Sequence, residues 1–416
     1  MHRKTVSKTG IVSKYILYIL VAFMPFHYII CELLISGSSI DNLWREALIA
    51  ILFAISITSM RIPKFGLLVI GISIYVFILS MLSPSLSFGV DTARTYVIPM
   101  FVYFGSYYCQ ETQRTYRSII KIITVTGFII ALWGLFEALV LGAGFMERIG
   151  YDFSSASSFY INGFYGVPRV LGTFVSANDA GSFYALAIFV SLYSNTNKHG
   201  MLLFAQAVMA VALVLTFSRS AILALLVALV LRSLVRSPRG DSWKARPVLP
   251  ILIGTALIAG SVVFLLTNER YGEMVLQHAL NTFTGTDASA AKHWEDLFEP
   301  LGIVLKNPLG FGFATSGPRA IAYYGEARAV ESSFYLAMYD MGILLGLVFF
   351  LPYLLRLFWL RKGASEAAQL ASICAAMCLV IYALLPSAQG YILPFFFYLL
   401  CGCADGSRRE SRKEPS

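Results

Sequence analysis

The sequence predicts an all-α polytopic membrane protein, and three observations lead to this fold class. Of the 416 residues, 57% are hydrophobic and only 13% are charged, and the mean hydropathy is +0.71. Long apolar runs recur along the whole chain, and the basic residues collect between them. Backbone groups inside lipid need internal hydrogen-bond partners, so apolar runs of this length are expected to be helices.

About twelve apolar runs are long enough to be transmembrane helices, which need roughly 17–25 residues. The predicted spans lie near residues 15–35, 43–60, 65–83, 96–110, 118–141, 178–194, 200–217, 219–235, 247–267, 331–355, 366–385 and 388–404. The fourth run, 96–110, is short, so a tilted or partly re-entrant helix is an alternative there. We interpret residues 1–416 as a single integral membrane domain.

The distribution of basic residues predicts the orientation, because loops that face the cytoplasm retain Lys and Arg. With the N-terminal tail inside, alternate loops place 22 of the 32 Lys and Arg residues on the cytoplasmic side. The alternation works only with an even number of spans, so both termini are predicted to be cytoplasmic. The net charge of +9 then follows from topology, and no nucleic-acid partner is expected.

The six cysteines predict neither a disulfide framework nor a metal site. All of them lie in or near the predicted spans. Cys401 and Cys403 are separated by a single glycine, which is the wrong spacing for a zinc ribbon. We interpret the six as apolar packing residues. The first apolar run lacks a small-residue cleavage site, so we expect it to remain as an anchor.

Two long segments, 142–177 and 268–330, are predicted to be periplasmic loops. The second holds five of the ten outer basic residues, and long loops in compact proteins usually carry function. Within it, apolar residues recur at helical spacing over 292–305, with Pro300 and Gly302 as interruptions. One amphipathic helix or a helix pair on the membrane surface fits this pattern, either as a cover for the bundle or as a substrate contact.

Arginines next to the predicted hydrocarbon region are the main functional signal. Arg169 and Asn178 lie between predicted spans, and Arg219 lies in the turn between two long apolar runs. A charge inside the membrane costs roughly 2.5–3.5 kcal/mol on insertion scales, so it is rarely retained without a use. These residues suggest that the protein handles an anionic group at the membrane surface.

The end of the second loop supplies further polar candidates. Arg319 and Arg328 precede Glu331, which opens a predicted span. Glu331 either shares a polar site with these arginines or only interacts with the helix dipole. Arg94 opens the short fourth span next to Asp91, where it forms either a plain ion pair or a contact with a lipid phosphate.

Several short motifs occur in a characteristic order along the chain. They are Arg169–Phe174 followed by Asn178 and Asp179, Leu215–Ser220, a large outer loop with Trp294, Asn307–Gly312, and Glu331–Gly342. Together they resemble the O-antigen ligase/polymerase superfamily of bacterial inner-membrane glycan enzymes, over about residues 165–345.

Two positions depart from the pattern of that superfamily. Its ligases usually have a histidine followed by asparagine where Glu331 and Ser332 stand, whereas its polymerases more often have an acidic residue. The resemblance therefore favours a polymerase. Lys292 stands where an arginine commonly precedes the loop tryptophan, and a lysine lacks the bidentate fork that suits phosphate.

The resemblance implies a glycosyltransferase. No Asp-x-Asp metal site appears in the predicted outer loops, so we expect a metal-independent transfer without a cofactor. Such an enzyme joins polyprenyl-pyrophosphate-linked oligosaccharide repeat units at the periplasmic face of the bacterial inner membrane, and makes O-antigen, capsule or exopolysaccharide. Glu331 is the candidate catalytic base, and Arg219 is the second candidate catalytic residue. The candidate substrate-binding residues are Arg169, Arg319, Arg328, Arg94 and Asn178.

The expected partners are the lipid-linked donor and acceptor oligosaccharides, membrane lipid, a chain-length regulator and a flippase. Two alternative functions stay open: an O-antigen ligase that transfers glycan to lipid A-core, and a flippase or transporter for lipid-linked oligosaccharide. A transporter is expected to carry charges along a central cavity, often with repeated halves. Here the strong charges gather at one face and no internal repeat is evident, which favours surface chemistry.

Overall fold

The computed structural model describes residues 8–34, 43–57, 62–109, 111–148, 151, 160–161, 164–195, 198–235, 288–325, 327–328, 330–360 and 364–412. Over these residues the protein is predominantly helical, as predicted. The described strands, β1 (Tyr160–Ile161) and β2 (Phe164–Pro168), pair as an antiparallel ribbon with Tyr160 opposite Pro168. This ribbon departs from the all-α prediction, in a segment rich in the aromatic residues that favour strands.

The contacts of the chain divide it into two compact units. Unit 1 comprises Met1–Tyr18, Arg45–Tyr116 and His293–Ser416, and unit 2 comprises Ile19–Trp44 and Arg117–Lys292. Each unit thus combines segments that are far apart in the sequence. The interpretation of residues 1–416 as one membrane domain stays a prediction.

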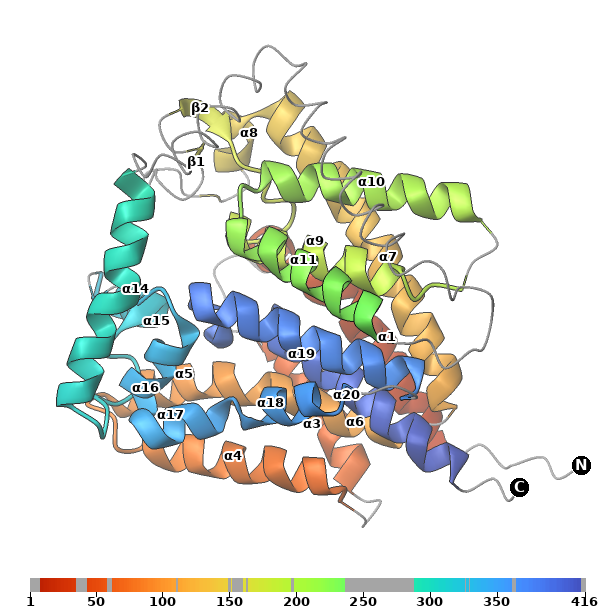
Figure 1. Ribbon diagram of the computed structural model, residues 1–416, viewed down its shortest axis with the longest axis horizontal. Helices are drawn as coiled ribbons and strands as arrows, with labels where there is room; N and C mark the ends of the chain where they lie inside the picture. Colours follow the sequence, from red (N-terminus) through yellow and green to blue (C-terminus); the bar gives the residue numbers. More distant parts are fainter. Residues whose placement is uncertain are drawn as a thin grey trace, which may run out of the picture. The chain divides into compact units, whose positions relative to one another are not determined.

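Unit 1 is built from helices of both ends of the chain. Its helices include α3 (Leu43–Ile57), α4 (Lys64–Ser80), α5 (Leu86–Val97), α6 (Val102–Tyr108), α15 (Gly317–Tyr324), α16 (Ser333–Met341), α17 (Ile343–Phe349), α18 (Leu351–Phe358), α19 (Glu366–Leu384) and α20 (Ile392–Ser411). Helix α20 packs against α6 and α19, α18 packs against α19, and α4 packs against α5 (Figure 1).

The contact between α20 and α6 depends on a glycine and on a buried ion pair. A side chain at Gly402 would collide with Ser106 and with the carbonyl oxygen of Tyr103, so only glycine allows this close approach. One turn further, the Asp405 carboxylate accepts a hydrogen bond from the Tyr103 hydroxyl at 2.8 Å and pairs with both terminal nitrogens of Arg356. This bidentate pair ties α6, α18 and α20 together.

Unit 2 is centred on three consecutive helices. They are α9 (Ala177–Ser191), α10 (His199–Leu215) and α11 (Arg219–Leu234), and α9 packs against both of the others (Figure 1). Helix α9 is buried over almost its whole length, so its small and aromatic residues form the core of the unit. The shorter helices α2 (His27–Leu34) and α8 (Ala143–Arg148) also belong to unit 2.

Three described helices are long and apolar enough to cross a membrane: Gly10–Cys31, Thr112–Leu141 and Glu366–Leu384. Two shorter apolar helices, Lys64–Ser80 and His199–Leu215, accompany them. The first of these, α4, exposes large apolar side chains, among them Leu67, Ile74 and Ile78. A helix with an exposed apolar stripe is expected in lipid rather than in water. These features are those of a membrane protein.

The predicted spans coincide with described helices, except for 247–267, which lies outside the described residues. Several of them are interrupted, as run 15–35 is by the 3-10 turn Met24–Phe26. Run 96–110 contains a 3-10 turn at Ile98–Phe101, where Pro99 cannot donate a backbone hydrogen bond. Run 331–355 is divided into α16, α17 and α18, because Gly342 adopts a positive φ of 82° and Pro352 starts a new helix.

The predicted outer segments contain local structure. Segment 142–177 contains α8 and the ribbon, and segment 268–330 contains α14 (Ala288–Lys306) and α15. Helix α14 continues through Pro300, so the pattern over 292–305 forms one helix rather than a pair. The side chains of Lys292 and Trp294 lie outside the described residues.

Candidate functional site

The candidate residues form two basic clusters, one in each unit. In unit 2, Arg169 and Arg219 lie near the loop between α10 and α11, and we call these two residues the arginine pair. Asn178 lies beside Arg169. In unit 1, Arg94 and Arg319 gather around Asp91; we call these three residues, with Glu46 and Tyr323, the carboxylate-bridged cluster.

Arg169 is positioned by the C-terminal end of α10. Its Nε donates to the carbonyl oxygen of Thr216 at 2.7 Å, and the neighbouring Val170 amide donates to the carbonyl of Leu215 at 3.1 Å. The last carbonyls of a helix have no partner within the helix and carry partial negative charge. The segment around Arg169 therefore satisfies the end of α10 while holding a guanidinium beside it.

Asn178 is positioned by the start of α9. Ser176 caps this helix: its hydroxyl accepts from the Asp179 amide at 3.1 Å and donates to the Asp179 carboxylate at 2.8 Å. The cap places Asn178 in the first turn, where its Oδ1 accepts from Arg169 Nη2 at 3.4 Å. This hydrogen bond joins the segment around Arg169 to the first turn of α9.

Arg219 is positioned by a strained turn. Phe217 adopts a left-handed φ of 53°, and the Thr216 hydroxyl accepts from the Ser218 amide at 3.2 Å. Helix α11 then begins at Arg219, whose side chain is exposed. Burial and, to a smaller extent, the charge of Arg219 lower the pKa of Arg169 to about 10. Two positive charges therefore share one region, which favours an anion there.

The carboxylate-bridged cluster has a different charge balance. Asp91 pairs with Arg94 at 2.5 Å and with Arg319 at 3.7 Å, and it also accepts a hydrogen bond from the Tyr323 hydroxyl. Burial raises the pKa of Tyr323, and the hydrogen bond to Asp91 raises it further. The phenol therefore stays neutral and donates to Asp91.

Arg94 also reaches Glu46 on α3, at 3.5 Å. The other oxygen of Glu46 accepts from the Tyr391 hydroxyl at 2.7 Å, and the Arg45 guanidinium lies 3.5 Å from the centre of the Tyr391 ring. Acidic and basic groups therefore alternate through the cluster.

Arg328 and Glu331 flank the segment that enters α16. Arg328 pairs with Glu299 of α14 at 3.1 Å and donates to the Tyr339 hydroxyl at 3.5 Å. Glu331 is half-buried and lies one residue before Ser332, whose hydroxyl caps α16 by accepting from the Phe334 amide at 3.2 Å. Because Ser332 supplies the cap, α16 does not need Glu331 for it.

The sequence offered an ion pair with Asp91 as one of two interpretations of Arg94, and the structure shows this ion pair. That contact has a local signal, the spacing of three residues along a helix. The partners Glu46, Glu299 and Tyr391 come from distant segments and have no such signal. Among the described residues, no group of three His, Cys, Asp or Glu side chains is arranged to hold a metal ion.

Neither a protein-family model nor a curated protein matches this sequence.

Proposed function

We propose that this protein is a glycosyltransferase that polymerises polyprenyl-pyrophosphate-linked oligosaccharide units at the periplasmic face of a bacterial inner membrane. In this proposal the chain crosses the membrane about twelve times, with both termini in the cytoplasm. The observation that carries the proposal is the arginine pair, in which the charge of Arg219 lies near the buried guanidinium of Arg169. Both charges would attract a pyrophosphate.

In the proposed reaction the protein mainly stabilises the negative charge that develops on the leaving group. The bond between the anomeric carbon and the pyrophosphate oxygen of the donor breaks, and an acceptor sugar hydroxyl forms the new glycosidic bond. Negative charge builds on the leaving pyrophosphate, where Arg219 and Arg169 donate charge-assisted hydrogen bonds with Asn178 beside them. Glu331 accepts the proton of the acceptor hydroxyl.

The remaining arginines have secondary roles in the proposal. Arg94 and Arg319 are already paired with Asp91, so a phosphate would gain less attraction from them. Arg328 is paired with Glu299 and lies close along the chain to Glu331. We assign these three to substrate positioning, with a donor and an acceptor oligosaccharide, membrane lipid, a flippase and a chain-length regulator as partners.

The glycans of cells that lack the protein test the proposed function. Loss of a polymerase leaves single repeat units on the surface glycan. Loss of a ligase instead leaves long polymer that is not transferred to lipid A-core, and loss of a flippase leaves lipid-linked units on the cytoplasmic side. Either of the last two results would contradict the proposal and identify the alternative.

Glu331→Gln tests the proposed base. Glutamine has nearly the same shape but cannot take the proton, so polymer formation is expected to fall by about a hundredfold or more, the range typical of general bases. Membrane abundance should not change, because Ser332 caps α16. Ser332→Ala is the matched control: it should lower stability by about 1 kcal/mol with little effect on polymer per molecule. Wild-type polymer from Glu331→Gln would exclude Glu331 as the base.

A further inference from the structure

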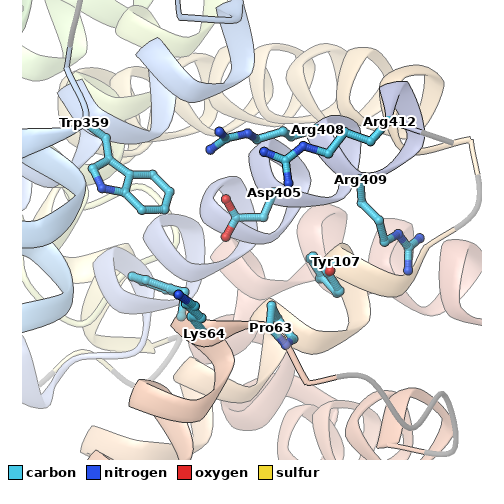
Figure 2. A pocket seen from close by; sticks show the side chains of 9 residues that line it. Pro63, Lys64, Tyr107, Trp359, Asp405, Arg408, Arg409 and Arg412 are labelled. Atoms are coloured by element: carbon cyan, nitrogen blue, oxygen red, sulfur yellow. The ribbon is translucent and has the colours of Figure 1, made fainter. Parts of the chain in front are cut away.

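A basic pocket lies in unit 1, and none of its lining residues belongs to the arginine pair or to the carboxylate-bridged cluster. It has a volume of about 330 Å³ and lies where the start of α4 meets the residue after α18 and the last turns of α20 (Figure 2). We define the basic pocket by six of its lining residues, Lys64, Tyr107, Trp359, Arg408, Arg409 and Arg412. Four of the six are cationic, and Asp405 also contributes to the lining.

The carboxylates of Asp405 and Glu410, near these cations, already have hydrogen-bond or ion-pair partners. Asp405 pairs with Arg356 and accepts from Tyr103, and Glu410 accepts from the Thr112 amide at 2.9 Å. In the part of the chain that the structure describes, no ion pair joins Arg408 or Arg412 to a carboxylate. The pocket therefore carries an excess of positive charge.

The orientation of the arginines leaves donors available in the pocket. Figure 2 shows Arg408 and Arg412 extending from α20 toward the side where Trp359 lies. Arg409 lies with its guanidinium 4.9 Å from the centre of the Tyr107 ring, and its buried Nε has no hydrogen-bond partner among the described residues. Planar guanidiniums with free donors suit the oxygens of a phosphate.

Apolar side chains adjoin the basic pocket. Phe358, next to Trp359, is 81% exposed, and Leu67, one turn after Lys64 on α4, is 56% exposed. Tryptophan next to basic residues at the end of an apolar helix is typical of the boundary between headgroups and hydrocarbon. The surroundings therefore suit an amphiphile, with a charged head and an apolar tail, better than a free ion.

We propose that the basic pocket binds the phosphate of an anionic lipid headgroup. The lining residues belong to segments predicted to face the cytoplasm, and anionic lipids attract basic residues at the ends of membrane helices. The site is independent of the proposed polymerase chemistry, because it shares no residue with the arginine pair or with Glu331.

Lipid retention measured by native mass spectrometry tests this proposal. The full-length protein is titrated with phosphatidylglycerol and, separately, with zwitterionic phosphatidylcholine. We expect preferential retention of phosphatidylglycerol, and about a tenfold or greater loss of its affinity in the double variant Arg408→Gln/Arg412→Gln. The variant Arg408→Lys/Arg412→Lys should keep most of the affinity, because the charge remains. Lys64→Gln, from the other side of the pocket, should weaken retention independently.

The matched control removes two arginines elsewhere. Arg114 and Arg117 are exposed on α7 (Thr112–Phe136) and lie outside the basic pocket, so Arg114→Gln/Arg117→Gln changes the net charge equally. Equal loss of lipid in this control, or unchanged retention in the pocket variants, would overturn the proposal. A further arm adds inorganic phosphate without lipid. Binding of inorganic phosphate as tight as that of phosphatidylglycerol would overturn the assignment to a lipid.

Discussion

The arginine pair and the carboxylate-bridged cluster contain the same type of side chain in opposite electrostatic settings. Arg94 and Arg319 contact Asp91, and Arg94 also contacts Glu46. Arg169 donates to a backbone carbonyl and to an amide oxygen, and its pKa is lowered by burial and by Arg219. One cluster balances its charges internally, whereas the other brings two like charges together.

This difference bears on how each cluster would respond to an added anion. A balanced cluster stabilises the protein without a ligand and gains little from an added anion. In the arginine pair, the charge of Arg219 lies near enough to Arg169 to lower its pKa. In the proposed function the pyrophosphate is therefore assigned to the arginine pair, whereas the sequence alone offered Arg94 and Arg319 as substrate-binding candidates beside Arg169.

Removal of the arginine pair should have the largest effect. Charge-assisted hydrogen bonds contribute roughly 1.5–3 kcal/mol each, so Arg169→Ala/Arg219→Ala should lower polymer formation by about a hundredfold or more. Polymer is measured on glycan gels and divided by the amount of protein in the membrane. The matched control Arg114→Ala/Arg117→Ala should retain full activity. Normal polymer from the double variant would show that the arginine pair does not bind the pyrophosphate.

Arg94→Gln should act mainly on stability. It leaves Asp91 with the longer contact to Arg319 and leaves the mostly buried Glu46 without its ion pair, at a cost of about 1–3 kcal/mol in the free energy of unfolding. A lower melting temperature in detergent is the expected result, with a smaller loss of polymer per folded molecule than in Arg169→Ala/Arg219→Ala, as expected for a positioning residue. The double variant Asp91→Asn/Arg94→Gln should recover part of the stability, since the two changes are coupled. A large loss of activity without a loss of stability would instead indicate that Arg94 contacts the pyrophosphate directly.

Arg219→Lys should have an intermediate effect on polymer formation. Lysine keeps the positive charge but loses the planar fork, so a loss of about tenfold, or about 1.4 kcal/mol, is expected. The protein should remain as stable as wild type, because Arg219 is exposed. The comparison uses polymer yield across Arg219→Lys and Arg219→Ala. Equal yields from these two variants would show that charge is not what Arg219 supplies.

Arg328→Ala should have the smallest effect on stability. Arg328 and Glu299 form an exposed ion pair, and such pairs contribute about 0–1 kcal/mol. Thermal unfolding should shift by no more than that amount, and Glu299→Ala serves as the matched control. A fall in polymer for Arg328→Ala as large as that for Arg219→Ala, with Glu299→Ala normal, would extend the ligand site to Arg328.

Local patterns along the chain predict the helical class and the position of the described helices. Apolar runs such as 366–385 and 200–217 coincide with α19 and α10, because burying the backbone in an apolar setting requires helical hydrogen bonds. Local spacing also indicated the ion pair of Arg94 with Asp91. These features depend on residues that are close together in the chain.

The packing of the folded chain sets where the helices are interrupted and which acidic and basic side chains pair with each other. Pro99 and Gly342 divide runs that are continuous by hydropathy, since backbone geometry does not depend on apolarity. Glu46 meets Tyr391, and Arg356 meets Asp405, only because packing brings distant helices together. No local sequence pattern identifies the distant partner of a charged residue. Only the folded chain therefore shows that Arg319 pairs with Asp91, whereas Arg169 lies near Arg219.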